Sequence, residues 1–133
     1  MKYLIFLLGF VSILMTQSFT ACDQTTAPTI TDPEFLLNCW IHVHEEVVEE
    51  GRYFQPCDFP DLPPSRFRAS YNFQEGGVCV YAVLAPNDAH YSLTGTWEYD
   101  TENAHVKIYD ADQVLVADFE VLELMENRLI VNP

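Results

Sequence analysis

A two-residue alternation of apolar and polar side chains is the feature that most narrows what this chain can fold into. It is clearest in the stretch HYSLTGTWEYD, residues 90–100. The residues on one face of this stretch are Tyr91, Leu93, Gly95, Trp97 and Tyr99. Successive side chains of a β-strand point to opposite faces of the sheet. The alternation therefore predicts a half-buried strand whose aromatic face is turned inward.

Turn-forming residues divide most of the remaining chain into short apolar runs. Glu75-Gly76-Gly77 supplies residues that tolerate positive φ, and Pro86-Asn87-Asp88 is rich in turn formers, so each predicts a hairpin. The seven predicted strands are 35–47, 66–73, 78–85, 90–100, 105–110, 114–124 and 128–132. This regular spacing predicts an all-β domain, a small antiparallel up-and-down β-barrel, with a β-sandwich as the alternative.

Residues 49–65, EEGRYFQPCDFPDLPPS, break this pattern. The segment has four prolines and no period, which predicts a long ordered loop rather than a strand. Its apolar side chains, Tyr53, Phe54, Phe59 and Leu62, are costly to leave in water. We expect the loop to dock against one mouth of the barrel with Phe54 or Phe59 inserted.

The N-terminus has the features of an export signal. Lys2 precedes a short apolar run that is too short to span a membrane comfortably, which predicts a secretory signal peptide over residues 1–21. The sequence FTAC, residues 19–22, resembles the lipobox of bacterial lipoproteins, although Phe19 stands where that family usually has leucine. The resemblance implies that Cys22 is lipidated and that residues 22–33 are a tether for a domain at 34–133. The protein is then exported and anchored to a membrane of the cell envelope; without the lipid it would be secreted.

Lipidation of Cys22 leaves three cysteines, Cys39, Cys57 and Cys79, in an oxidising compartment. At most one disulfide can form within such a chain, and one thiol stays free or buried. Cys39 and Cys79 each begin a predicted strand at the same end of an up-and-down barrel, so a bond between them is one geometric possibility. Cys57 can pair with either if its loop folds back, and the pairing stays open. Without lipidation, four cysteines allow two bonds.

Charge and motifs exclude several functions. The formal net charge is −14, which disfavours binding to nucleic acid and to anionic membrane surfaces. The sequence has no G-x-S-x-G, no phosphate-cradling glycine loop and no H-E-x-x-H. A non-catalytic protein without a cofactor is expected.

Three groups of residues are candidates for binding. His42 and His44 lie two apart on a predicted strand, a weak candidate for a metal site, because His90 and His105 are not placed near them by the sequence. Arg66 and Arg68 share a strand face and can grip an anion. The aromatic residues predicted to line or to fill the barrel are Trp40, Phe67, Tyr71, Phe73, Tyr91, Trp97 and Tyr99.

The order GTWEYD, VKIYD and FEVLELMENRLIV resembles the second half of the small lipocalin-like domains of bacterial lipoproteins. Trp40, in Asn38-Cys39-Trp40, stands where the opening tryptophan of that fold belongs. The resemblance covers roughly residues 36–131 and implies the barrel fold but little about function. In such barrels an aromatic inner face can line a cavity, so the function we expect is binding of a small apolar ligand. The alternative is a protein-binding module, an inhibitor or an envelope-assembly partner, that uses the 49–65 loop and the acidic residues Glu45, Glu46, Glu49 and Glu50.

Replacing the lipidated cysteine tests the anchor. We expect Cys22→Ser to release the protein from the membrane fraction or to block its maturation, because serine cannot accept the thioether-linked lipid. Fractionation and N-terminal analysis of the exported protein measure this. Unchanged membrane association and unchanged processing in the variant would contradict lipidation.

Overall fold

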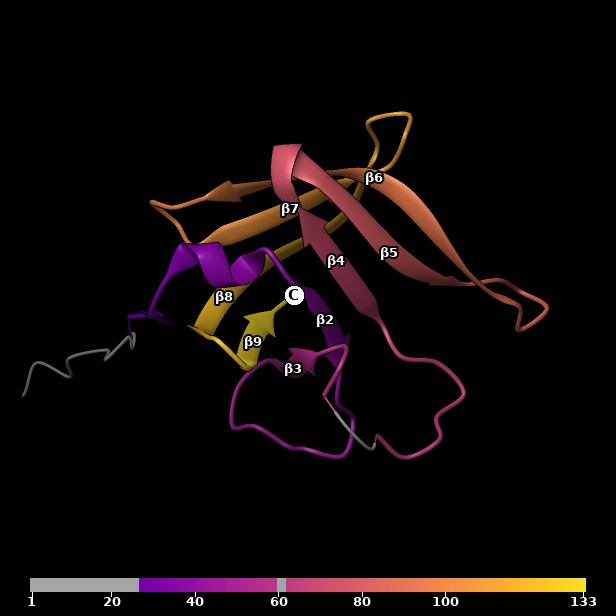
Figure 1. The fold of residues 1–133 in the computed structure, drawn as a ribbon, viewed down its shortest axis with the longest axis horizontal. Coiled ribbons are helices and arrows are strands. Elements are labelled where there is room, and N and C mark those ends of the chain that lie inside the picture. Colours follow the sequence, from indigo (N-terminus) through magenta and orange to yellow (C-terminus); the bar gives the residue numbers. More distant parts are fainter. Residues whose placement is uncertain (1–26, 60–61) are drawn as a thin grey trace, which may run out of the picture.

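The computed structural model describes residues 27–59 and 62–133, which form a closed antiparallel barrel of eight strands (Figure 1). The predicted all-β barrel is confirmed. The predicted signal peptide, Cys22 and the first part of the predicted tether lie outside the described residues.

The barrel consists of short strands that follow one another closely along the chain. The strands are β1 (Thr29–Ile30), β2 (Cys39–His42), β3 (Arg52–Pro56), β4 (Ser70–Gln74), β5 (Val78–Leu84), β6 (His90–Asp100), β7 (His105–Tyr109), β8 (Leu115–Met125) and β9 (Arg128–Asn132). Two short 3-10 helices are η1 (Pro33–Leu36) and η2 (Glu75–Gly77). Strand β1 lies in the segment predicted to be the tether, so ordered structure begins before residue 34.

The strands from β4 to β9 are a meander in which each pairs with the next. The ring is completed by β2, which pairs with β4, and by β3, which lies between β2 and β9. Strand β8 is longer than its neighbour β7, and β1 pairs in parallel with the part of β8 that β7 leaves free, Thr29 with Glu123 and Ile30 with Leu124. Within the ring each strand is paired on both sides, which is a usual way for a small antiparallel sheet to limit aggregation.

The prediction that residues 49–65 form a loop without strands was wrong. Strand β3 lies inside this segment, where Phe54 pairs with His42 of β2 and with Leu129 of β9. The prolines do not prevent this, because the first of them, Pro56, is the last residue of the strand. Phe54 is buried as part of the barrel wall, whereas Phe59 is half exposed, so the segment is not a lid inserted into a barrel mouth.

Both predicted hairpins are present. Gly76 and Gly77 have φ of 74° and 75° between β4 and β5, a conformation that glycine adopts without a steric penalty. Asp88 has φ of 62° between β5 and β6, where the amide of Ala85 donates to the carbonyl of Ala89 over 2.9 Å. These turns set the register that places the alternating aromatic residues on one face.

One end of the barrel is filled and covered. Helix η1 lies over this end, and its Leu36 is fully buried. The indole Nε1 of Trp40 donates to the carbonyl of Leu36 over 3.3 Å, which ties the helix to β2. The largest fully buried side chains of the molecule are Trp40, Phe73, Leu36, Ile108, Leu124, Leu129, Val106, Val121 and Cys79.

A disulfide joins Cys39 at the start of β2 to Cys57 directly after β3, with Cα atoms 5.3 Å apart. The alternative bond between Cys39 and Cys79 is not formed. Trp40 points into the barrel, so Cys39 points out, whereas Cys79 is fully buried inside. The two cysteines are therefore on opposite faces of the sheet. Burial raises the pKa of the Cys79 thiol to about 12, which keeps it protonated and unreactive.

Removing the disulfide should destabilise the barrel. The bond spans 18 residues, a loop for which chain entropy predicts about 3 kcal/mol of stabilisation. We expect the double variant Cys39→Ala, Cys57→Ala to lose about that much free energy of unfolding in a urea titration. Reductant should lower the stability of the native protein and leave the variant unchanged. Finding Cys39 and Cys57 as reactive thiols in the denatured, unreduced protein would refute the bond.

Candidate functional site

The end of the barrel opposite helix η1 is open. Strands β2, β5, β7 and β9 end there and β3, β4, β6 and β8 begin there. A hollow of about 310 Å³ lies in this mouth. It is lined by Arg52, Phe54, Tyr71, Val116, Ala117, Asp118, Phe119, Val131 and Pro133. We call it the inner hollow.

A second hollow of about 430 Å³ adjoins the first and shares Tyr71, Val116 and Ala117 with it. Its other lining residues are Tyr81, Ala82, Val83, Leu84, Leu93 and Asp110. We call it the outer-arm hollow. The two volumes fall in the range of small-molecule sites, about 300–1,000 Å³, and most of their lining is aromatic or aliphatic.

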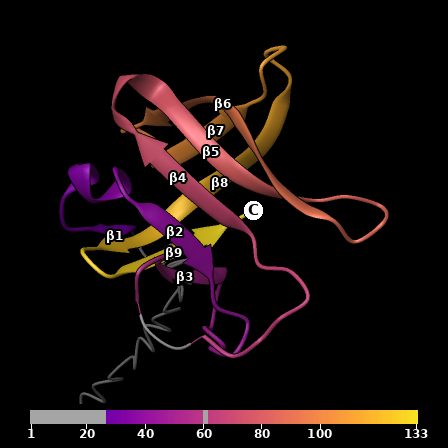
Figure 2. The ribbon, with the colours of Figure 1, turned by 45° about the vertical axis from the view of Figure 1, so that its right-hand side comes forward.

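The β5–β6 hairpin is longer than its neighbours and forms one side of the outer-arm hollow. The pairing of β4 with β5 begins at Tyr71 with Tyr81, and that of β6 with β7 begins at Thr96 with Tyr109. Residues 82–84 and 90–92 therefore pair only with each other, and the hairpin projects beyond the ring of strands (Figures 1 and 2). Its apolar face borders the outer-arm hollow.

The predicted aromatic lining divides between the two ends. Trp40 and Phe73 fill the closed half, and Trp97 packs against them, with its ring 4.8 Å from that of Phe73. Tyr99 also packs against the core. Of the seven predicted aromatic residues, Tyr71 is the one that lines the hollows, and it lines both.

Two of the seven residues do not line the barrel interior as predicted. Tyr91 is 47 % exposed, because the strand that carries it continues past the barrel into the projecting hairpin. Phe67 precedes β4 and contacts the ring of His90, with the two ring centroids 5.8 Å apart. Alternation predicted the face of each residue but not how far along its strand the barrel extends.

Sequence reasoning missed several lining residues. Ala117 and Phe119 alternate along β8, so the period-two pattern of VLVADFEVLEL was a usable signal for them. Phe54 is predicted by the sequence as part of the 49–65 loop, whereas it lies in β3. No sequence pattern indicated that Arg52 lines a hollow, because the prolines of residues 49–65 led us to predict a loop where β3 is found.

His42 and His44 are close together, with their ring centroids 4.1 Å apart. His44 Nε2 donates to the carbonyl of Phe67 over 3.0 Å, and His105 Nδ1 donates to Asp118 over 3.0 Å at another part of the sheet. Within the described residues, no group of three His, Cys, Asp or Glu side chains is placed to hold a metal ion. His42 is the last residue of β2, so it lies at the end of the barrel that carries the mouth.

Arg66 and Arg68 do not form the anion grip that their spacing suggested. Arg68 donates to both carboxylate oxygens of Glu45, over 2.9 and 2.6 Å, and to the carbonyls of His42 and Pro63. The Arg68 hydrogen bond holds the pKa of Glu45 down at about 2. Arg66 forms an ion pair with Asp88. Both arginines are occupied by the protein itself, and Arg68 ties the loops before β3 and before β4 to the end of β2.

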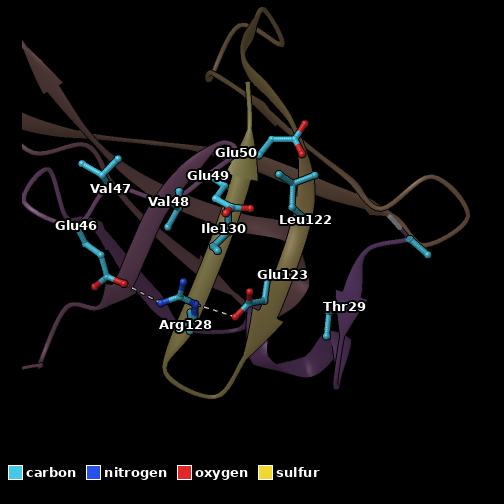
Figure 3. Close-up of a pocket in the computed structure, with 11 residues that line it drawn as sticks. Thr29, Glu46, Val47, Val48, Glu49, Glu50, Leu122, Glu123, Arg128 and Ile130 are labelled. Carbon is cyan, nitrogen blue, oxygen red and sulfur yellow. Dashed lines mark hydrogen bonds and ion pairs between the residues drawn. The ribbon is translucent and has the colours of Figure 1, made fainter. Parts of the chain in front are cut away.

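A third hollow, of about 400 Å³, lies on the outer surface against β8 and β9, under residues 46–50 (Figure 3). It carries the acidic residues Glu46, Glu49, Glu50 and Glu123. Arg128 lies among them, and its guanidinium bonds to Glu46 over 2.9 Å and to Glu123 over 2.8 Å. The acidic segment of the alternative function is thus partly neutralised from within.

None of the helices in the described residues is long and apolar enough to cross a membrane. No family model, curated protein or solved structure matches this chain.

The histidine at the rim of the mouth makes stability depend on pH. Burial lowers the pKa of His42 from 6.5 to about 4, and the positive charges of His44, Arg52 and Arg68 act in the same direction, against Glu45. The unfolded chain then binds more protons than the folded one between those values, so stability should fall as pH drops from about 6.5 to about 4. We expect His42→Gln to flatten this part of the profile, with His90→Gln as the control. An NMR titration of His42 with a midpoint near 6.5 would contradict the effect.

Proposed function

We propose that this chain is a non-catalytic, exported protein, anchored by a lipid on Cys22, whose lipocalin-like barrel binds a small apolar ligand at its open end. The observation that carries the proposal is the pair of adjoining hollows, about 310 and 430 Å³, that meet at Tyr71, Val116 and Ala117. The disulfide between Cys39 and Cys57 is compatible with the oxidising compartment that export implies.

The distribution of exposed apolar side chains supports a ligand at this end. Ten large apolar residues of the described chain are exposed, and a run of them borders the mouth. The residues of this run are Leu84, Tyr91, Leu93, Val114, Leu115 and Val116. A concentration of exposed apolar side chains beside a hollow is typical of a binding surface. A ligand that covers them would recover about 25 cal/mol for each Å² removed from water.

The two halves of the barrel differ in packing: one is filled, and the other contains the hollows. Helix η1, Trp40 and the disulfide fill and fasten the closed half, so stability does not require side chains to fill the mouth. Cys57 is held in the disulfide and Cys79 is buried with a raised pKa, so neither offers a thiolate for covalent chemistry. These features favour binding over catalysis.

Filling the shared wall of the two hollows tests the proposal. We expect Ala117→Phe to weaken labelling of the membrane-anchored full chain by a diazirine-bearing alkyl alcohol, because the added ring occupies the space where the hollows meet. The half-saturating concentration should rise at least tenfold, which corresponds to about 1.4 kcal/mol. Mass spectrometry of the labelled peptides gives both the yield and the position of the label.

Two control variants make the outcome specific. Val47→Phe adds the same ring at an exposed position that lines neither the inner hollow nor the outer-arm hollow, and it should leave labelling unchanged. Glu49→Gln with Glu50→Gln alters the third hollow and should also leave labelling unchanged. No specific label in the native mouth, or equal loss in all three variants, would reject ligand binding at the open end.

A further inference from the structure

Arg52 differs from the other arginines of the barrel. Among residues 27–59 and 62–133, it is the one arginine for which no carboxylate of these same residues lies within ion-pairing distance. Arg66 pairs with Asp88, Arg68 with Glu45, and Arg128 with Glu46 and Glu123. In a chain with 20 acidic and only 6 basic residues, carboxylates are plentiful, so an arginine without one is unexpected.

The position of Arg52 on β3 places it at the mouth of the barrel. It lies two residues before Phe54 on β3 and pairs across the sheet with Val131, whose side chain is buried in the barrel. Residues paired across a sheet share a face, so Arg52 is on the inward face at the rim. There it lines the inner hollow. Its positive charge contributes to the lowered pKa of His42 and opposes the rise that burial causes in the pKa of Tyr71.

We propose that the ligand is an amphipathic carboxylate whose head group binds the guanidinium of Arg52 in the inner hollow and whose apolar tail extends into the outer-arm hollow. This inference rests on the proposed function, since it names the chemistry of the ligand at the same site. An arginine fork matches a carboxylate bidentately, and such a charge-assisted pair is stronger than a neutral hydrogen bond.

The charges around the two hollows give the ligand one orientation. The inner hollow has Arg52 at its rim, and its one acidic side chain, Asp118, already accepts a hydrogen bond from His105 over 3.0 Å. The outer-arm hollow has no cationic lining residue and contains Asp110. A carboxylate at that end would meet a like charge among apolar groups, so the head belongs at Arg52 and the tail beside Val83, Leu84 and Leu93.

The same charges favour a monoanion over a dianion such as a phosphate monoester. One guanidinium neutralises one negative charge, and a second would lie unpaired in the mouth of a protein with a net charge of −14. A single carboxylate on a long apolar tail satisfies the arginine and covers the exposed apolar residues together.

Photolabelling with two matched probes tests the inference on the membrane-anchored full chain. The probes are an unbranched alkyl carboxylic acid and the corresponding alcohol, each with a diazirine at the tail end. We expect the acid to label residues of the outer-arm hollow at lower concentration than the alcohol. Arg52→Gln should raise the half-saturating concentration of the acid about tenfold or more and change that of the alcohol less than twofold. Arg52→Lys, which keeps the charge, should restore part of the difference.

The control is Arg66→Gln, which removes an exposed, ion-paired arginine at the same end of the barrel and should affect neither probe. If acid and alcohol label the native mouth equally and Arg52→Gln changes neither, the carboxylate inference is wrong while ligand binding stands. If neither probe labels the mouth, both the inference and the proposed function fail. Equal weakening of the acid by Arg52→Gln and Arg66→Gln would indicate general surface charge and would also overturn the role of Arg52.

Discussion

The pairing of β3 with β9 is the interaction on which the rest of the structure depends, because it closes the ring. Tyr53, between Arg52 and Phe54, aligns with Ile130 of β9, while the other edge of β3 pairs with β2. Without β3, the edges of β2 and β9 would expose unpaired backbone groups. The same strand places Phe54 in the interior and Arg52 at the rim. The pairing that closes the barrel therefore also positions two residues that line the inner hollow. The disulfide after Pro56 fastens this strand to the start of β2.

The barrel has its filled core at one end and its two hollows at the other. In the closed half, Trp40 and Phe73 fill the space and η1 covers it, which is the packing expected of a small domain that has to stabilise itself with one core. In the open half, the long β5–β6 hairpin projects past its neighbours and leaves the two hollows and their apolar rim. Leu84, Leu93 and Val116 line these hollows or their rim and remain exposed.

The arginines of this strongly acidic protein differ in what they contact. Arg68, with a side chain only 8 % exposed, joins three segments by bonding to Glu45 and to the carbonyls of His42 and Pro63. Arg128 moderates the acidic outer hollow. Arg52 is left facing the mouth, which is the position where a positive charge can select a ligand rather than stabilise a loop.

The sequence by itself determined the all-β class, the hairpins at 75–77 and 86–88, and the inward face of most strands, because side-chain alternation and turn chemistry are local properties. It also limited the cysteines to one bond if Cys22 is lipidated. Only the tertiary structure decided that residues 52–56 form a strand, since that strand is stabilised by partners from both ends of the chain, β2 and β9. The same long-range pairing selected Cys39–Cys57 and placed Arg52 at the mouth of the barrel. Tyr91 lies outside the barrel because the β5–β6 hairpin extends past the neighbouring strands. Local patterns carry no information on where a distant strand ends. The two hollows lie where strands of unequal length meet, so the sequence alone could not predict them.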